Sequence, residues 1–234
     1  MRLFDKKRLA ATVQRAAGFI RVTSPGAPSR SVPPASPNAR AGATLIRSTK
    51  VVLRPKRTED AQDDYAWRMD EELATLDATV PLRQSFEDFV RLHREETLNP
   101  FPWSQRFSID TLDGKHIGNC MCYDINMSYG EAEMGIMIGD RDYWSQSYGY
   151  HSIVALVDHM FRSTSLRRLY LHTLEWNTRA RRCFEKCGFT FRRIVEKSGK
   201  SFVLMDISRD HWHGIRDEKL APQDGSSRHH PDAG

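Results

Sequence analysis

The most constraining feature of this 234-residue sequence is a strand pattern that leads through a short loop into an amphipathic helix. The segment "EAEMGIMIGD" (131–140) follows a turn at 128–130 and is typical of a strand. After the loop "YWSQSYGYHS" (143–152), apolar residues recur at i, i+3, i+4, i+7 and i+8. These residues are Ile153, Leu156, Val157, Met160 and Phe161. The pattern predicts a sheet covered by a helix.

Other segments extend this pattern into a complete domain. Asp113-Gly114 is a strong hairpin signal between two apolar runs, and Asn177 is a good N-cap for a helix that Gly188 ends. Further strands are predicted at 50–55, 167–174 and on both sides of 198–200, and further helices start at Thr58 and Ser85. The order β-α-α-β-β-β-α-β-α-β-β predicts an α/β domain. Its mixed central sheet has about seven strands with about four helices and is not doubly wound.

Composition divides the chain into one domain and two tails. Residues 1–44 are rich in Pro, Ser and Ala and carry a net charge of +7, so the remaining residues sum to −2. The basic charge therefore belongs to a tail that we expect to be disordered, and the domain itself gives no reason to expect DNA binding. The composition of the front half is similar to that of a transit peptide, but a solvated tail is the favoured interpretation. We predict one folded domain at 45–210 and a second loose tail at 211–234.

The apolar runs and cysteines point to a soluble, cytoplasmic protein. The longest apolar run, "SIVALVDHMF", is short and contains charged residues, so no membrane association is predicted. There is no apolar signal-peptide core, so disulfides between the four cysteines are not expected. The pairs Cys120/Cys122 and Cys183/Cys187 lack a recognised zinc spacing, and packing of Cys183 and Cys187 on a core face is favoured over a zinc site.

Four patterns resemble the GNAT acyl-CoA N-acyltransferase superfamily. They are "LRPKRTEDAQDDYAWRMDEE", "GEAEMGIMIGDRDYW", the loop at 143–152, and "LHTLEWNTRARRCFEKCGF", which is the most specific. They span about 160 residues in the order of that superfamily. The first pattern is similar to the branch that contains ribosomal-protein N-terminal acetyltransferases.

The resemblance implies acetyl-CoA as cosubstrate, with no metal. Its pyrophosphate would meet the backbone N–H groups of the loop at the start of a helix. The implied cofactor-binding residues are Trp144, Gln146, Ser147, Tyr148, Gly149 and Tyr150 in the loop, Met137 and Ile138 in the preceding strand, and Asn177, Ala180 and Phe184 in the later helix. The family usually has Gly-Lys-Gly where this chain has Ser145-Gln146-Ser147, which predicts weaker binding without abolishing it.

The resemblance also implies roles in the reaction. A backbone amide near Met137 or Ile138 would donate to the thioester oxygen, and Asn177 would hold the pantetheine arm or a water. Glu133, on the same strand, is the candidate catalytic base, acting through water, with a surface charge as the alternative. Phe184 stands where the family often has a tyrosine that protonates the leaving thiolate. Phenylalanine has no proton to donate, so slower chemistry or another acid is expected.

The predicted function is transfer of an acetyl group to a primary amine. An acidic segment beside the expected acceptor site would attract a cationic amine such as a polyamine, an aminoglycoside or a protein N-terminus, with a solvated acidic helix face as the more common alternative. It contains Asp60, Asp63, Asp64, Asp70, Glu71, Glu72 and Asp77. Two alternatives stay open: a non-catalytic acyl-CoA-binding relative, and an RNA- or ribosome-associated protein that acts through its basic tail. A homodimer is one assembly that the sequence allows.

Overall fold

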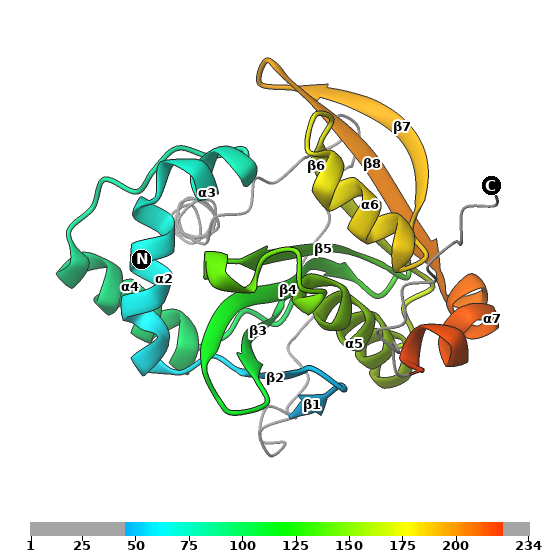
Figure 1. The fold of residues 1–234 in the computed structure, drawn as a ribbon, viewed down its shortest axis with the longest axis horizontal. Helices are drawn as coiled ribbons and strands as arrows, with labels where there is room; N and C mark the ends of the chain where they lie inside the picture. The colour runs from blue at the N-terminus through cyan, green and yellow to red at the C-terminus, as the bar shows by residue number, and fades with distance from the viewer. Residues whose placement is uncertain (1–44, 222–234) are drawn as a thin grey trace, which may run out of the picture.

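The computed structural model describes residues 45–221, which form one eight-stranded sheet with helices on both faces (Figure 1). The strand order is β1-β2-β3-β4-β5-β6-β8-β7, and every pair is antiparallel except β5 and β6. The strands are β1 (Ile46–Arg47), β2 (Val51–Pro55), β3 (Gln105–Thr111), β4 (His116–Asn126), β5 (Glu131–Ile138), β6 (Arg168–Leu174), β7 (Thr190–Lys197) and β8 (Lys200–Ser208). The predicted mixed α/β sheet is confirmed, with one strand more than expected.

The helices follow the signals of the sequence closely in the middle of the chain. Ser85 accepts a hydrogen bond from the Asp88 amide at the start of α4, and Asn177 caps α6 in the same way. The helical segments are η1 (Thr58–Asp60), α2 (Ala61–Met69), α3 (Glu71–Leu76), α4 (Phe86–Leu98), η2 (Arg141–Tyr143), α5 (Tyr148–Ser163), α6 (Thr178–Lys186) and α7 (Arg209–Leu220). No helix within residues 45–221 is long and apolar enough to cross a membrane.

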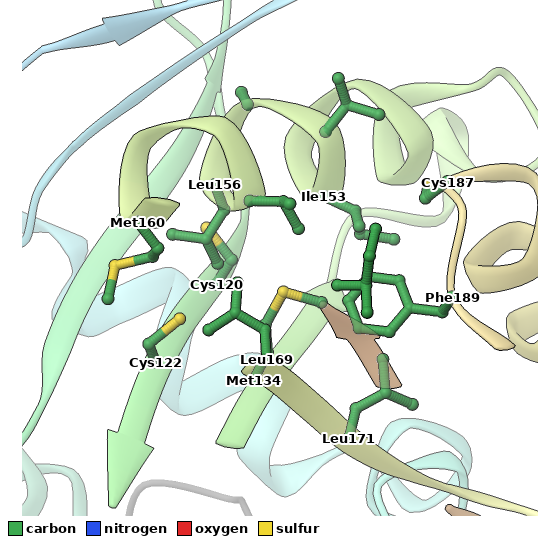
Figure 2. Close-up of a cluster of buried hydrophobic side chains, with 14 of the residues drawn as sticks. Cys120, Cys122, Met134, Ile153, Leu156, Met160, Leu169, Leu171, Cys187 and Phe189 are labelled. Carbon is green, nitrogen blue, oxygen red and sulfur yellow. The ribbon is translucent and has the colours of Figure 1, made fainter. Parts of the chain in front are cut away.

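One face of the sheet packs against α5 and forms the apolar core. Leu156 and Met160 of α5 are fully buried against strand residues such as Cys122 and Leu169 (Figure 2). Cys120 and Cys122 both lie in this core as free thiols. Cys187 is buried in the same core and Cys183 packs against it, as predicted for these two cysteines. The stripe at 153–161 therefore holds the helix on the sheet.

The opposite face is covered by α2 through buried ionic groups. Arg54 of β2 donates to Asp60 and to Asp110 of β3, at 2.7 and 2.5 Å, and all three side chains are less than a tenth exposed. On α2, Asp64 pairs with Lys56 and accepts hydrogen bonds from His93, His116 and Asn119. Burial by itself would raise the pKa of Asp64, but Lys56 and the two histidines hold it well below its usual range.

Two elements differ from the sequence-based expectation. The short helix α3 was not predicted, and α7 replaces the loose tail expected from residue 211, so that prediction is wrong for residues 211–220. Helix α7 is fixed by Trp212, which is 1 % exposed, and by Arg216, which donates to Asp158 of α5. A single buried tryptophan gives no apolar period, which explains why α7 was missed. The predicted tail at 1–44 lies outside the described residues.

The parallel strands β5 and β6 pair over only three residues and then separate. Their register runs from Glu131↔Arg168 to Glu133↔Tyr170 and ends there, although each strand continues. Beyond Glu133 the edge of β5 that faces β6 has no strand partner. The site described below lies at this separation.

Candidate active site

A cavity of about 280 Å³ opens where β5 and β6 separate. Its wall is formed by the outer half of β5, the loop before α5, the first turns of α5 and α6, and the end of α3. All the predicted cofactor-binding residues except Gln146 line it: Met137, Ile138, Trp144, Ser147, Tyr148, Gly149, Tyr150, Asn177, Ala180 and Phe184. Glu133 lines it as well. The structure thus brings together predicted residues from Glu133 to Phe184.

The loop before α5 has the backbone shape of a glycine loop but is built from serines. Ser145 and Ser147 both have left-handed backbones, with φ of 58° and 66°. Serine reaches this region at a cost of about 1–3 kcal/mol per strained position. Ser147 is the N-cap of α5, yet its side chain makes no capping hydrogen bond. The first N–H groups of α5 therefore remain available to an anionic ligand at the cavity.

A lysine from a distant segment of the chain contacts this loop. The ammonium of Lys50, in the turn between β1 and β2, donates to the carbonyl oxygen of Gln146 at 2.6 Å and lies 4.5 Å from the centre of the Tyr148 ring. The Gln146 side chain turns back to the carbonyl of Asp142. Sequence reasoning missed Lys50 because ninety-six residues separate it from the loop.

Trp144 forms an aromatic wall of the cavity between two arginines. Its indole N–H donates to the carbonyl of Ile138 at 2.7 Å, and the guanidinium carbon of Arg179 lies 4.0 Å from its ring centre. Arg179 is in the first turn of α6 and also lines the cavity. The guanidinium carbon of Arg141 lies 5.5 Å from the same ring centre, and Arg141 pairs with Asp70 and Glu72 at the start of α3.

The backbone of β5 presents alternate amides to its two edges. Gly139 donates to the carbonyl of Ile117 on β4, while the carbonyl of Ile138 accepts from Trp144, away from β4. Because polar groups of successive residues point to opposite edges, the amides of Ile136 and Ile138 face the separation and that of Met137 faces β4.

Residues at the start of α6 and in α5 form part of the cavity wall, and Asn177 also caps α6. The Asn177 side-chain oxygen accepts from the Ala180 amide at 3.1 Å, which confirms the predicted cap. Phe184 is 7 % exposed and packs edge-to-face on Phe189, so it is a core residue as well as a wall residue. The Tyr150 hydroxyl donates to the carbonyl of Lys219 on α7, and burial raises its pKa to about 12.

Glu133 is the carboxylate closest to the point of separation. It is buried, and its Oε1 lies at the hydrogen-bond distance of 2.9 Å from Nδ1 of His172. Its Oε2 is fully buried. Tyr123 lies opposite Glu133 on β4, and burial together with the charge of Glu133 raises the pKa of Tyr123 well above its usual value. His172 and Tyr123 both line the cavity, and no motif in the sequence indicated them.

The acidic segment near the acceptor side is mostly neutralised by ion pairs. Five of its seven carboxylates are paired, with Arg54, Lys56, Arg141 or Arg68 as partners. Of the seven, Asp77 alone lines the cavity, and burial raises its pKa well above the usual range despite Arg68. The expected long-range acidic field is therefore weaker than the count of carboxylates suggests. Within residues 45–221, no group of three or more His, Cys, Asp or Glu side chains could hold a metal ion.

The sequence model of the acetyltransferase (GNAT) domain matches residues 50–190, which is more than half of the chain. The chain therefore belongs to the GNAT acetyltransferase family, and the prediction that it is an acyltransferase is confirmed. No curated protein matches the sequence.

Solved structures share the fold at low sequence identity. Spermidine N-acetyltransferase from Vibrio cholerae, in complex with CoA and spermine, is 19% identical with a TM-score of 0.64, covering 71% of this chain and 99% of that one. Aminoglycoside acetyltransferase AAC(6')-Ib with coenzyme A is 19% identical, with a TM-score of 0.60 and the same coverage. A putative ribosomal-protein-serine acetyltransferase from Vibrio cholerae is 18% identical, with a TM-score of 0.58 over 70% of this chain and 97% of that one.

Proposed function

We propose that this domain transfers an acetyl group from acetyl-CoA to a primary amine by direct attack on the thioester. The observation that carries the proposal is one cavity joining uncapped helix amides, free strand amides and a buried carboxylate. Each of these serves a different part of the reaction. Similar structures that bind CoA, or are called spermidine or aminoglycoside acetyltransferases, support the same cosubstrate and an amine acceptor.

The residues of the loop and of α6 would hold the cosubstrate. The N–H groups at the start of α5 suit a pyrophosphate, because the helix dipole adds to the hydrogen bonds there. Arg179 places a positive charge at the same wall, stacked on Trp144. Asn177 uses its oxygen as a cap, so its amide N–H₂ is the group that it can offer to the pantetheine arm.

The strand β5 would polarise the thioester and receive the amine. Of the two amides predicted as oxyanion donors, Ile138 is favoured over Met137, and Ile136 joins it, because these amides face the separated edge. Glu133 stands on the same strand as the carboxylate for proton removal. The branch of ribosomal-protein acetyltransferases and the homodimer stay predictions.

Thiol release across a panel of amines tests the proposal. The full chain is incubated with acetyl-CoA and spermidine, an aminoglycoside or a peptide with a free N-terminus, and CoA thiol is titrated. The expected result is amine-dependent release with one class of acceptor. Release at the rate of buffer alone with every amine would contradict the proposal.

A non-catalytic acyl-CoA-binding relative is the second candidate. Phe184 in place of a proton donor, and strained serines in place of glycines, favour it. The two functions separate in one experiment. A binder shifts the melting temperature with acetyl-CoA but releases no thiol with any amine.

A further inference from the structure

His172 lies just past the end of the β5–β6 pairing, beside Glu133. The last paired residues are Glu133 and Tyr170, so His172 is two positions further along β6, on the same face of the strand as Tyr170. Its Nδ1 lies 2.9 Å from Oε1 of Glu133. Both residues line the cavity. The two side chains thus bridge the separating strands at the point where an acceptor would meet the thioester.

The two partners differ in how open they are to the cavity. The side chain of Glu133 is 2 % exposed and that of His172 is 9 % exposed. One oxygen of Glu133 is occupied by the imidazole, the other is buried, and the carboxylate also interacts with the side chain of Tyr123. Within residues 45–221, the Nε2 atom of His172 makes no hydrogen bond, and it is not fully buried. An amine in the cavity therefore reaches the imidazole more readily than the carboxylate.

This arrangement is that of a base and the carboxylate that orients it. A carboxylate on Nδ1 selects the imidazole tautomer whose Nε2 carries a lone pair, and it stabilises the imidazolium that forms. The other titratable groups around the pair are Glu131 of β5, Tyr123 and Asp124 of β4, Tyr170 and Arg168 of β6, and Asp77 after α3. Burial raises the pKa values of Tyr123, Tyr170 and Asp77. These three groups therefore favour their neutral forms.

We propose that His172 is the catalytic base that takes the proton of the acceptor amine, and that Glu133 is its positioning residue. The proposal rests on the proposed acetyl transfer and changes the role of Glu133 within it. The amine nitrogen forms a bond to the thioester carbon while its proton passes to Nε2. The C–S bond then breaks, its electron pair leaves on sulfur, and the imidazolium returns its proton to the thiolate or to solvent.

The test uses substitutions that separate the base from its support. His172→Asn keeps an amide N–H near the position of Nδ1, so the hydrogen bond to Glu133 persists, but it removes the base. His172→Ala removes both. We expect kcat to fall about 10²–10⁴-fold in both variants, with an unchanged Kd for acetyl-CoA by calorimetry. His213→Gln on the exposed face of α7 is the matched control and should retain the rate.

The pH profile distinguishes His172 from Glu133 as the base. In the parent protein, kcat should rise with pH as an imidazolium loses its proton. Glu133→Gln should lower kcat, because the imidazole loses the carboxylate that orients it, and His172→Asn should abolish this limb. Added imidazole should restore part of the rate of His172→Ala. Full activity with an unchanged limb in both His172 variants, together with inactive Glu133→Gln, would overturn the proposal and leave Glu133 as the base.

The outcome is separate from that of the proposed function. If the parent protein binds acetyl-CoA but acetylates no amine, the proposed transfer itself fails. If the parent is active and the His172 variants match it in rate and in Kd, only the assignment of His172 fails. A His172 variant that loses acetyl-CoA binding shows a structural role for this residue and also overturns its assignment as a base.

Discussion

The two faces of the sheet are buried by different means. The face under α5 is closed by apolar side chains such as Leu156 and Met160, which fill space without directional bonds. The face under α2 is closed by buried charges such as Arg54 and Asp64, each satisfied by partners on other elements. On the face under α5, the stability lost on substitution should therefore scale with the side-chain volume removed. On the face under α2, it should depend on whether each buried charge keeps its partners.

Removal of Arg54 should give the largest loss of stability. Arg54→Met leaves Asp60 and Asp110 buried without their cation, and loss of one partner of a buried pair costs about 3–5 kcal/mol. Urea unfolding measures the free energy. Arg91→Met, which breaks an exposed pair with Asp88, is the matched control and should cost less than about 1 kcal/mol. Equal losses for the two variants would remove the distinction between the buried face and the surface.

Truncation in the apolar face should cost a comparable or smaller amount. Leu156 is fully buried beneath α5, and Leu→Ala substitutions in cores cost about 2–5 kcal/mol. The same urea experiment checks Leu156→Ala. A loss below about 1 kcal/mol would mean that α5 packs more loosely than its burial indicates.

The pH dependence of stability should have opposite signs at two aspartates. The folded pKa of Asp64 is lowered, so its stabilisation is present above the unfolded pKa of about 3.9 and is lost as pH falls through the folded value. The pKa of Asp77 is raised, so the protonated form stabilises the fold at low pH, and this stabilisation is lost as pH rises through the folded value. Asp64→Asn should flatten the acid limb of a stability curve. Asp77→Asn should flatten the loss of stability that occurs as pH rises. Equal slopes of stability against pH in both variants would contradict this assignment.

Relief of backbone strain in the loop should give a smaller, stabilising effect. Ser147→Gly removes a left-handed serine at φ 66° and should stabilise the fold by about 1 kcal/mol. It should also tighten acetyl-CoA binding, because a glycine lets the loop backbone approach the pyrophosphate more closely. Ser198→Gly is the matched control, since its φ is 50° in the β7–β8 turn and Ser198 does not line the cavity. It should stabilise equally and leave the Kd unchanged.

Loss of the cation behind the loop should have the smallest effect. Lys50→Met removes one hydrogen bond to Gln146 and a contact with Tyr148, and an exposed interaction of this kind is worth about 1 kcal/mol or less. We expect a few-fold weaker Kd for acetyl-CoA with an unchanged melting temperature. Lys200→Met, at the carbonyl of Ala78, provides the comparison. A Kd for Lys50→Met equal to that of the parent would exclude a supporting role.

The sequence predicted the apolar face well and the polar face poorly. Periodicity located α5, and local capping rules located the starts of α4 and α6, because these signals act within a few residues. Local signals gave no reason to join Arg54 to Asp110, or Glu133 to His172, because such pairs form only after distant strands meet. Helix α7 was missed for a related reason, since Trp212 is its one buried residue and its contacts with α5 form only in the folded chain.

The candidate site shows the same division. The predicted cofactor-binding residues lie in short contiguous motifs, and all of them except Gln146 line the cavity. The acceptor side depends on contacts between strands, and His172, Tyr123 and Lys50 came only from the fold. The acidic segment was overestimated as a binding field because the arginines and lysines that pair with it lie elsewhere in the chain.

Calorimetric titration of the full chain with acetyl-CoA tests the central claim most directly. Ala180→Trp, which adds a large ring at the cavity wall on α6, serves as the blocked variant. We predict one-to-one binding by the parent protein, tighter binding by Ser147→Gly and none by Ala180→Trp. No heat and no thermal shift for the parent at millimolar acetyl-CoA would contradict the assignment of this cavity to the cosubstrate.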